Sequence, residues 1–456
     1  MASEKTEATH STNRRVWQLA WPSILSNLLF TTVGFMHIKI VAGLGTSSVA
    51  AVTTGHRVFF LIQAILMGLS VAATAIIARH WGAKDVRRAE IVTWTTLGFS
   101  IALGALLSLP ALIAPRAIAG LFGLDDQTTA FAAGFIFGRG VFNVFAAINM
   151  MLGTALRAIG DVITPLWYRL FRSILNISFA FCLAFGIGPL PALGVSGIAA
   201  GGGFGALLVT AVFVYRWWQG RYALKAVKEA SIDWVTTRQL VSIGAPAIIE
   251  QGAVQLAFLV FFSIVAKYGT SAYAAYGIGI SLVSFSIVIG FGFGIAAATI
   301  VGQQLGAGQP QLAIKAGWRS LRMALVAMTA LSVILVSVAE DLARFMIADE
   351  EVVQLTVAFI YIIAIVQPIM ACEFTLSGAL RGAGDTRFPL LATLCGIFLG
   401  RLIPAWIAAS LGLSVYWIFA VMILDYGIKA LMLTLRFRSG KWLDIRLSAN
   451  KSKPTA

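Results

Sequence analysis

Residues 155–161 read ALRAIGD, and residues 379–385, which lie 224 positions later, read ALRGAGD. A proline follows each copy, at Pro165 and Pro389, and each copy lies where one long apolar run ends and another begins. Arginine near a helix C-terminus meets the negative end of the helix dipole, and glycine takes the left-handed conformation that ends a helix. Aspartate is a good cap for the start of the next helix, and proline is favoured in the first turn of that helix. The stretch therefore predicts a tight helix-to-helix turn, made twice.

The side chains of this turn allow two interpretations. In the structural one they only end one helix and start the next. In the functional one they act as latches of a cytoplasmic gate. The candidate gate residues are Arg157, Gly160, Asp161, Arg381, Gly384 and Asp385.

The composition around these turns is that of a membrane protein. Of the 456 residues, 59% are hydrophobic and only 12% are charged, and the mean hydropathy is +0.87. A soluble protein of this size needs a more charged surface. About twelve apolar runs are long enough for a helical span of about 20 residues, and period-two patterns typical of strands are absent. We expect an all-α polytopic membrane protein with about twelve transmembrane helices.

The offset of 224 residues extends beyond the turn. Pro22 maps to Pro246 and Gly68 maps to Gly292, and matches at one fixed offset over most of a chain indicate an internal repeat. Each repeat holds about six spans of about 20 residues. Because six is even, the repeats have the same orientation, so we expect parallel repeats related by a pseudo-two-fold axis along the membrane normal.

These repeats define the expected domains. Two similar bundles joined by one link favour lobes that rock about a central cleft, although duplication without functional motion is the alternative. The expected parts are a cytoplasmic N-terminal tail (1–15), an N-terminal six-helix lobe (16–218), a cytoplasmic linker (219–238), a C-terminal six-helix lobe (239–436) and a cytoplasmic C-terminal tail (437–456).

The net charge of +15 is distributed unevenly. Basic residues gather in alternate loops, around residues 79–88, 216–228, 315–322 and 436–446, whereas the loop at 340–351 is acidic. This is the positive-inside bias of membrane proteins, not a nucleic-acid footprint. We expect a multi-pass protein of the cell inner membrane with both termini in the cytoplasm and no nucleic-acid partner.

Signals of an enzyme are missing from the sequence. It has no Walker loop, so direct use of ATP is not expected. The four histidines and three cysteines are scattered without metal-ligand spacing. We expect no enzymatic activity, no metal and no cofactor.

The motifs together resemble those of the MATE (multidrug and toxic compound extrusion) family. The turn follows the fourth span of each repeat, and residues 82–85 (GAKD) and 306–309 (GAGQ) resemble the family's motif after the second span of each half. The resemblance covers residues from about 15 to 435 and is closest to the DinF-type branch. It implies an antiporter that expels organic solutes in exchange for protons or sodium.

The sequence departs from the family in its N-terminal half. Where many members carry an acid in the first span, this chain has His37. Of the Asn and Asp that many members carry in the fifth span, Asn176 matches the first, but Ala180 stands at the second position. The N-terminal acidic site that the family uses for coupling is therefore not expected here.

The N-terminal half carries basic groups within its spans instead, among them His37, Arg57 and Arg139. Cations in lipid are costly and usually face the bundle interior. Pairing with carbonyl groups is one interpretation. The other is a positively lined substrate cavity that admits anionic or zwitterionic compounds, with Asn176 in its wall.

The acids lie in the C-terminal half. Glu250 follows Pro246 by one turn on the seventh span, and Glu373 lies eight residues before Arg381 on the tenth. At about 1.5 Å per residue, both lie roughly 12–15 Å deep. Burial and mutual repulsion favour the protonated form of such acids, so Glu250 and Glu373 are the candidate ion-coupling residues. The alternative is that they are hydrogen-bonded acids that hold the lobe together.

Further polar groups lie in the spans of the same half. Asp425 and Lys429 have the i, i+4 spacing of an ion pair, and Arg401 is a candidate partner of Asp425 or Glu373. The candidate residues of the substrate cavity here are Gln251, Gln255, Tyr276 and Gln367.

We therefore expect a monomeric secondary active exporter of organic solutes, drugs or metabolites that exchanges them for protons by alternating access of two lobes. Its expected partners are a small organic substrate and membrane lipids. A sodium-coupled exporter of the same family is one alternative. A flippase for lipids or lipid-linked glycans, with Arg57 and Arg139 at a lateral opening, is another.

Overall fold

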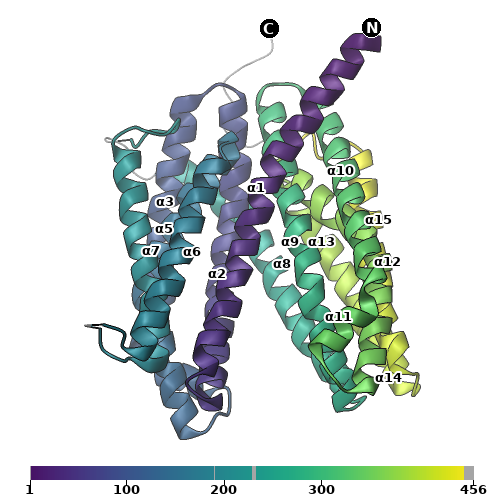
Figure 1. The fold of residues 1–456 in the computed structure, drawn as a ribbon. Coiled ribbons are helices and arrows are strands. Elements are labelled where there is room, and N and C mark those ends of the chain that lie inside the picture. Colours follow the sequence, from purple (N-terminus) through teal and green to yellow (C-terminus); the bar gives the residue numbers. More distant parts are fainter. Residues whose placement is uncertain (1, 189, 228–232, 446–456) are drawn as a thin grey trace. The chain divides into compact units, whose positions relative to one another are not determined.

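The computed structural model describes residues 2–188, 190–227 and 233–445, with side chains from residue 13 onward. The described residues form helices and connecting turns and contain no strand (Figure 1). Twelve of the helical segments are long and apolar enough to cross a membrane, which confirms the all-α polytopic fold. The helices are α1 (Ala2–Ala42), α2 (Thr46–Gly82), α3 (Val86–Ile113), α4 (Pro115–Gly120), α5 (Asp126–Ile159), α6 (Ile163–Phe185), α7 (Gly194–Trp218), α8 (Trp234–Ala266), α9 (Thr270–Gly306), α10 (Pro310–Ser337), α11 (Ala339–Met346), α12 (Glu350–Gly382), α13 (Arg387–Cys395), the π-helix η1 (Gly396–Leu402), α14 (Ile403–Ser410) and α15 (Val415–Arg438).

The chain divides into two compact units. The N-terminal unit comprises Leu25–Gly244, and the C-terminal unit comprises Met1–Ile24 and Ala245–Ala456. Both divisions fall inside helices, α1 and α8, and both lie within two residues of a repeat-related proline, Pro22 or Pro246. A proline lacks the N–H that would continue the backbone hydrogen bonds, so a helix bends most readily there.

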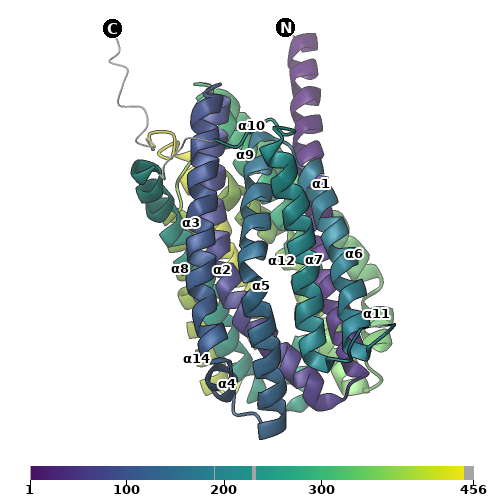
Figure 2. The same ribbon diagram turned by 90° about the vertical axis from the view of Figure 1, so that its left-hand side faces the viewer.

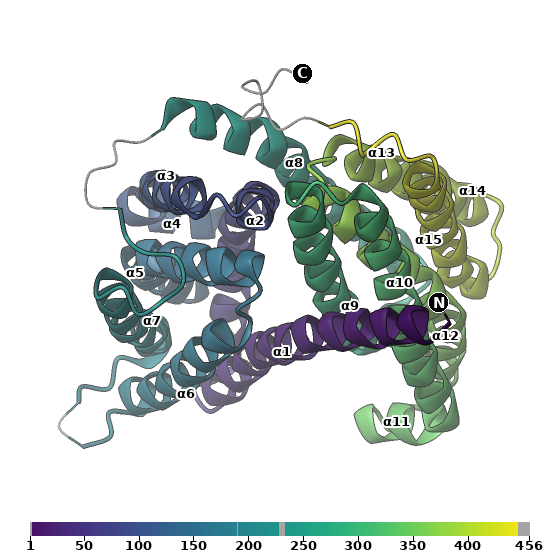
Figure 3. The same ribbon diagram turned by 90° about the horizontal axis from the view of Figure 1, so that it is seen from above.

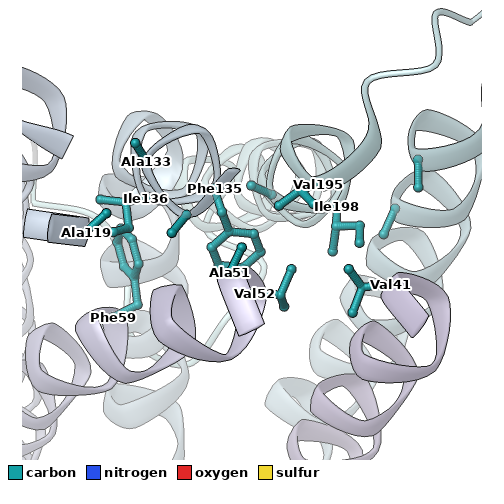
Figure 4. Packing of buried hydrophobic residues seen from close by; sticks show 14 of the residues in the cluster. Val41, Ala51, Val52, Phe59, Ala119, Ala133, Phe135, Ile136, Val195 and Ile198 are labelled. Carbon is teal, nitrogen blue, oxygen red and sulfur yellow. The ribbon is translucent and has the colours of Figure 1, made fainter. Parts of the chain in front are cut away.

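In the N-terminal unit, α5 packs against α2, α3 and α7, and α7 packs against α6. Figure 2 shows α5 with α2 and α3 on one side and α7 on the other. Phe59, Phe135 and Ile198 are core residues from three different helices (Figure 4). A Cβ at Gly55 would lie only 2.2 Å from the Phe135 ring, so the small residue lets α2 and α5 approach closely.

In the C-terminal unit, α12 packs against α9, α10 and α15 (Figure 3). The contact of α12 with α9 is close because a Cβ at Gly378 would lie 2.3 Å from the carbonyl oxygen of Gly294. Residues from the start of α1 belong to this unit: Arg15 donates to the side chain of Gln303 at 2.5 Å, and the ring of Trp17 lies 6.4 Å from that of Phe293.

The eleventh span is not a uniform helix. Between α13 and α14 the backbone widens into the π-helix η1, a form that is rare and often found at functional sites. A Cβ at Gly396 would lie 2.6 Å from Oδ1 of Asp425, and one at Gly400 would lie 2.5 Å from the Cα of Asp425. The two glycines thus bring η1 directly against the charged residues of α15.

Both copies of the repeated turn have the same backbone structure. Gly160 and Gly384 have positive φ angles of 100° and 92°, which glycine adopts without strain. The following aspartate then begins the next helix: Oδ1 of Asp161 accepts from the N–H of Thr164 at 3.0 Å, and Oδ1 of Asp385 accepts from that of Phe388 at 3.3 Å. The predicted helix-to-helix turn is therefore present twice.

The connection between α7 and α8 is attached to α3. Oε1 of Glu90 accepts from the backbone N–H of Lys225 at 3.0 Å, and Arg88 donates to Asp233 at 2.6 Å. The side chain of Asp233 in turn accepts from the N–H of Thr236 at 3.2 Å and so caps the start of α8. The first residues of α8, 234–238, belong to the range predicted as the linker, of which residues 228–232 lie outside the described residues.

Candidate functional site

Glu250 lies in the C-terminal unit on α8 and is 5% exposed. Its Oε1 accepts two hydrogen bonds, from the guanidinium of Arg381 at 2.6 Å and from the hydroxyl of Thr393 at 2.8 Å. Its Oε2 is buried and has no hydrogen-bond partner in the described part of the chain. A proton could therefore add at Oε2 without displacing either donor from Oε1, and it would remove the negative charge that attracts Arg381.

Glu373 on α12 shares a cation with a second acid. The ammonium of Lys429 lies 3.5 Å from Oε1 of Glu373 and 3.1 Å from Oδ1 of Asp425. Asp425 also forms an ion pair with Arg401, as the sequence suggested. Glu373 lies close enough to Glu250 for their charges to repel. Like Glu250, Glu373 has one buried carboxylate oxygen, Oε2, without a hydrogen-bond partner among the described residues.

The negative charges of the carboxylates in this network equal the positive charges of its cations in number. Its ion pairs join the acids Glu250, Glu373 and Asp425 to the bases Arg381, Lys429 and Arg401. Breaking a buried ion pair by removing one partner is strongly unfavourable because it leaves a charge uncompensated. A change of protonation at one acid must therefore alter the contacts of its neighbours.

Aromatic rings surround the basic end of the network. The guanidinium of Arg401 lies over the rings of Phe258 and Tyr426, at 5.4 and 5.6 Å, which stabilises the cation. Tyr276 is fully buried, within electrostatic reach of Arg401. Its ring packs on that of Phe359 at 5.5 Å, and its hydroxyl has no hydrogen-bond partner in the described chain.

The other polar residues predicted for the cavity differ in burial. Gln367 is fully buried, and neither atom of its amide is hydrogen-bonded within the described residues. Gln251 and Gln255 are partly buried and face the same side of α8. The structure thus places Tyr276 and Gln367 inside the C-terminal unit and leaves Gln251 and Gln255 partly accessible on it.

A separate polar cluster lies in the N-terminal unit. His37 is 1% exposed, and its Nε2 lies 2.7 Å from Oδ1 of Asn176. The ring of His37 stacks on that of His56 at 5.6 Å, and His56 meets the edge of Phe135 at 5.3 Å. Lys39, two residues after His37, is exposed, because side chains two positions apart on a helix point to different sides.

Arg139 completes this cluster. Its guanidinium lies 5.5 Å from the ring centre of Phe59 and within electrostatic reach of both His37 and His56. A Cβ at Gly202 would lie 3.5 Å from Nη1 of Arg139 and 3.2 Å from Oδ1 of Asn176. The ends of both side chains therefore lie next to Gly202.

The remaining predicted residues lie outside these two clusters. Arg57 is exposed on the N-terminal unit, and the structure does not bring it to Arg139 by any described contact. Arg157 donates to Thr154 of its own helix at 2.9 Å. Asp385 forms an ion pair with Arg436 at 2.8 Å, which ties the second turn to α15.

Sequence reasoning missed Thr393, Gly202 and the pairing of Arg381 with Glu250. Glu250 is separated in sequence from Arg381 by 131 residues and from Thr393 by 143. No local spacing rule relates such positions. The position of Arg381 in the repeated turn was a signal for the residue, but not for its partner.

Comparison with known proteins identifies the family of this chain. The MatE family model matches residues 22–182 and 246–407, one stretch in each repeat. The "Probable multidrug resistance protein NorM" of Thermotoga maritima is 27% identical over 443 residues, which cover 93% of this chain and 92% of that protein.

Solved structures share the fold. A crystal structure of a mutant of the MATE transporter VcmN from Vibrio cholerae has a TM-score of 0.89 at 19% identity and covers 95% of this chain and 98% of its own. A MOP superfamily transporter from Pyrococcus furiosus, described as having a binding pocket of reverse polarity that suggests a different function, has a TM-score of 0.86 at 20% identity, with 94% of this chain and 97% of its own covered. On the family match, which extends over both repeats, this chain belongs to the MATE family, whose members are membrane transporters and not enzymes.

Proposed function

We propose that this protein is a secondary active exporter that expels organic solutes, drugs or metabolites in exchange for protons. The observation that carries the proposal is the pair of acids Glu250, which is buried, and Glu373, which is partly buried. Each is held by a cation, and each has one buried carboxylate oxygen without a hydrogen-bond partner among the described residues. The name of the Thermotoga maritima relative, a probable multidrug resistance protein, supports the direction of transport.

The proposal includes the setting of the transporter. It works as a single chain in the cell inner membrane, surrounded by lipid, with both termini in the cytoplasm. It needs no cofactor besides the coupling ion. Within the MATE family, we assign the chain to the DinF-type branch on the detailed pattern of its repeated motifs.

Proton uptake changes the ion pairs of the network. A proton on Glu373 removes one of the two negative charges that hold Lys429, so the ammonium is drawn towards Asp425. A proton on Glu250 removes the charge that holds Arg381 at the end of α12. Both changes alter contacts between helices of the C-terminal unit, which is how we propose that protonation drives its rearrangement.

The rearrangement is passed to the rest of the chain through α1 and α8. The chain passes from one unit to the other inside these helices, next to Pro22 and Pro246. Because Pro246 lies one turn before Glu250, bending of α8 and protonation of Glu250 are coupled in our proposal. The two units then rock and expose the substrate alternately to each side of the membrane.

The test is transport by the full chain in reconstituted vesicles under an imposed pH gradient, screened with chemically diverse compounds. Glu250→Gln and Glu373→Gln should each reduce gradient-driven export, and the double variant should abolish it. Glu340→Gln is the matched control because Glu340 is an exposed acid paired with Arg344. Export by the double variant at the wild-type rate would overturn the proposal.

Sodium coupling is the second candidate, and the position of Lys429 argues against it. Its ammonium lies between Glu373 and Asp425, where a bound cation would otherwise contact the same oxygens. Export driven by a sodium gradient at equal pH on both sides, and lost without sodium, would favour this candidate over proton coupling.

A lipid or lipid-linked glycan flippase is the third candidate, and the exposure of Arg57 favours it. An exposed cation within a span suits contact with an anionic headgroup. Thermal stabilisation of the purified protein by anionic lipids but not by soluble compounds would support a flippase, and the reverse result would support the exporter.

A further inference from the structure

Three partly buried cations of the N-terminal unit have no carboxylate partner among the described residues. Arg139, Arg169 and Arg172 lie within membrane spans, and none of them forms a hydrogen bond or an ion pair within residues 25–227 and 233–244 of the described chain. The acidic residues of that part all lie at the start of a helix or just before one: Asp85, Glu90, Asp125, Asp126, Asp161 and Asp233.

These cations nevertheless lie near one another. Arg172 is within electrostatic reach of both Arg169 and Arg139, so the three positive charges repel. Arg169, Arg172 and Asn176 have i, i+3, i+7 spacing and share one face of α6. Arg139 reaches Asn176 from α5, above Gly202. The result is a row of cations that ends at the polar cluster of Asn176 and His37.

The C-terminal unit shows that the same chain can pair cations of its spans with carboxylates. There Arg381, Arg401 and Lys429 each contact a carboxylate. The N-terminal unit instead relies on aromatic contacts, Phe59 for Arg139 and Phe30 for Arg169. A ring stabilises a cation without cancelling its charge, so this unit keeps a positive charge that a bound anion can neutralise.

The hydrogen-bond donors of this group of side chains suit an oxyanion. Two guanidinium groups offer forked N–H donors that match carboxylate and phosphate oxygens. When Nε2–H of His37 donates to Oδ1 of Asn176, the amide N–H groups of Asn176 stay available to a ligand. We propose that Arg139, Arg172 and Asn176 bind a doubly charged oxyanion, a phosphate monoester or a dicarboxylate. This inference rests on the proposed export function and names the substrate class of its N-terminal unit.

The test is binding to the purified full chain without any ion gradient. The probes are phenyl phosphate and glutarate, with phenol and dimethyl glutarate as uncharged counterparts, and vesicles containing phosphatidate against phosphatidylcholine. Binding of either soluble anion, and not of its uncharged counterpart, is expected. Stabilisation by phosphatidate alone would assign the oxyanion to a lipid headgroup. Binding of none of the anions, or equal binding of the uncharged counterparts, would overturn the proposal.

Variants locate the site. Arg139→Gln and Arg172→Gln should each weaken anion binding about ten-fold, the loss typical of one hydrogen bond to a charged group. Gly202→Ala keeps every charge but crowds Arg139 and Asn176, and should also weaken binding. Arg116→Gln, at an exposed cation of the same unit, should bind as the wild type does. Unchanged affinity in both arginine variants would overturn the assignment.

Two further measurements separate anion binding from folding and from proton-driven export. Arg139→Lys preserves the charge and should retain more affinity than Arg139→Gln, which separates a binding role from a folding role. Anion binding should survive in the Glu250→Gln, Glu373→Gln double variant. Loss of proton-driven export with anion binding retained would count against the proposed function alone. Proton-driven export of organic cations without anion binding would count against this inference alone.

Discussion

The guanidinium of Arg381 donates to Glu250 at 2.6 Å, so an arginine of the repeated turn contacts a buried acid of another helix. Its counterpart Arg157 donates to Thr154 within its own helix. The two turns share one backbone structure, and the second is joined to the ionic network through Arg381. Variants of the network residues, compared with matched controls, should therefore show how much each contact contributes to the stability of the protein.

Arg381→Gln should destabilise the protein because it leaves Glu250 without its cation. Removing one partner of a buried pair costs about 3–5 kcal/mol, and we expect about 2 kcal/mol here because Arg381 remains partly accessible to solvent. Denaturant unfolding in detergent measures the free energy. Arg438→Gln, at an exposed arginine of α15, should change it little. Equal stability of the two variants would contradict the role of the pair.

Thr393→Val removes the second hydrogen bond to Glu250 while preserving shape. We expect a loss of about 1.5–3 kcal/mol, the range for hydrogen bonds to charged groups. Thr356→Val is the matched control, because Thr356 is fully buried and its hydroxyl has no partner among the described residues. That variant should be neutral or stabilising. Thermal unfolding of both variants decides whether the Thr393 hydroxyl matters.

Gly400→Ala should displace η1 from α15. The added Cβ would lie 2.5 Å from the Cα of Asp425, so the backbone must shift, at a cost of about 1–3 kcal/mol. We expect a lower unfolding temperature. Gly427→Ala introduces the same methyl group on α15, where nothing lies within 4 Å, and should not lower it. A harmless Gly400→Ala would show that the close approach is not required.

Asp233 should make stability depend on pH. Burial raises the pKa of Asp233, but the hydrogen bond from Thr236 and the charge of Arg88 outweigh it, so its pKa lies below the usual 3.8. A lowered pKa contributes stability above 3.8 that is lost as the pH falls through the folded-state value. Asparagine can still cap the helix, but Asp233→Asn removes the charge that pairs with Arg88, so it should cost about 1 kcal/mol at pH 7, the upper value for a partly exposed ion pair.

The pH profile tests this assignment. The stability difference between wild type and Asp233→Asn should shrink as the pH falls below 3.8. Asp341→Asn, at an exposed acid, should show no such difference at either pH. A difference that stays constant with pH would mean that the carboxylate charge plays no part.

Features set by local sequence were predictable. The length of the apolar runs gave the spans, and glycine with aspartate gave both turns, because a positive φ and a side-chain cap involve only neighbouring residues. The i, i+4 spacing predicted the ion pair of Asp425 with Lys429. Similar reasoning grouped Arg57 with Arg139, although one is exposed and the other partly buried, because hydropathy does not tell which face of a helix turns inward.

Features set by distant parts of the chain were not predictable. The π-helix η1 and the partners of Glu250 depend on how α8, α12, α13 and α15 pack together. The long α1 is a further case, because its apolar run gives no sign that its two ends belong to different units.

That division of α1 affects how the protein is made. Residues 13–24 contact α9 through Arg15 and Trp17, yet they are synthesised before the whole of the N-terminal unit and well before α9. The C-terminal unit therefore cannot be completed from the later part of the chain alone. Its earliest segment must stay available in the membrane until its neighbours have been inserted. The completed unit therefore combines the segment that is synthesised first with those that are synthesised last.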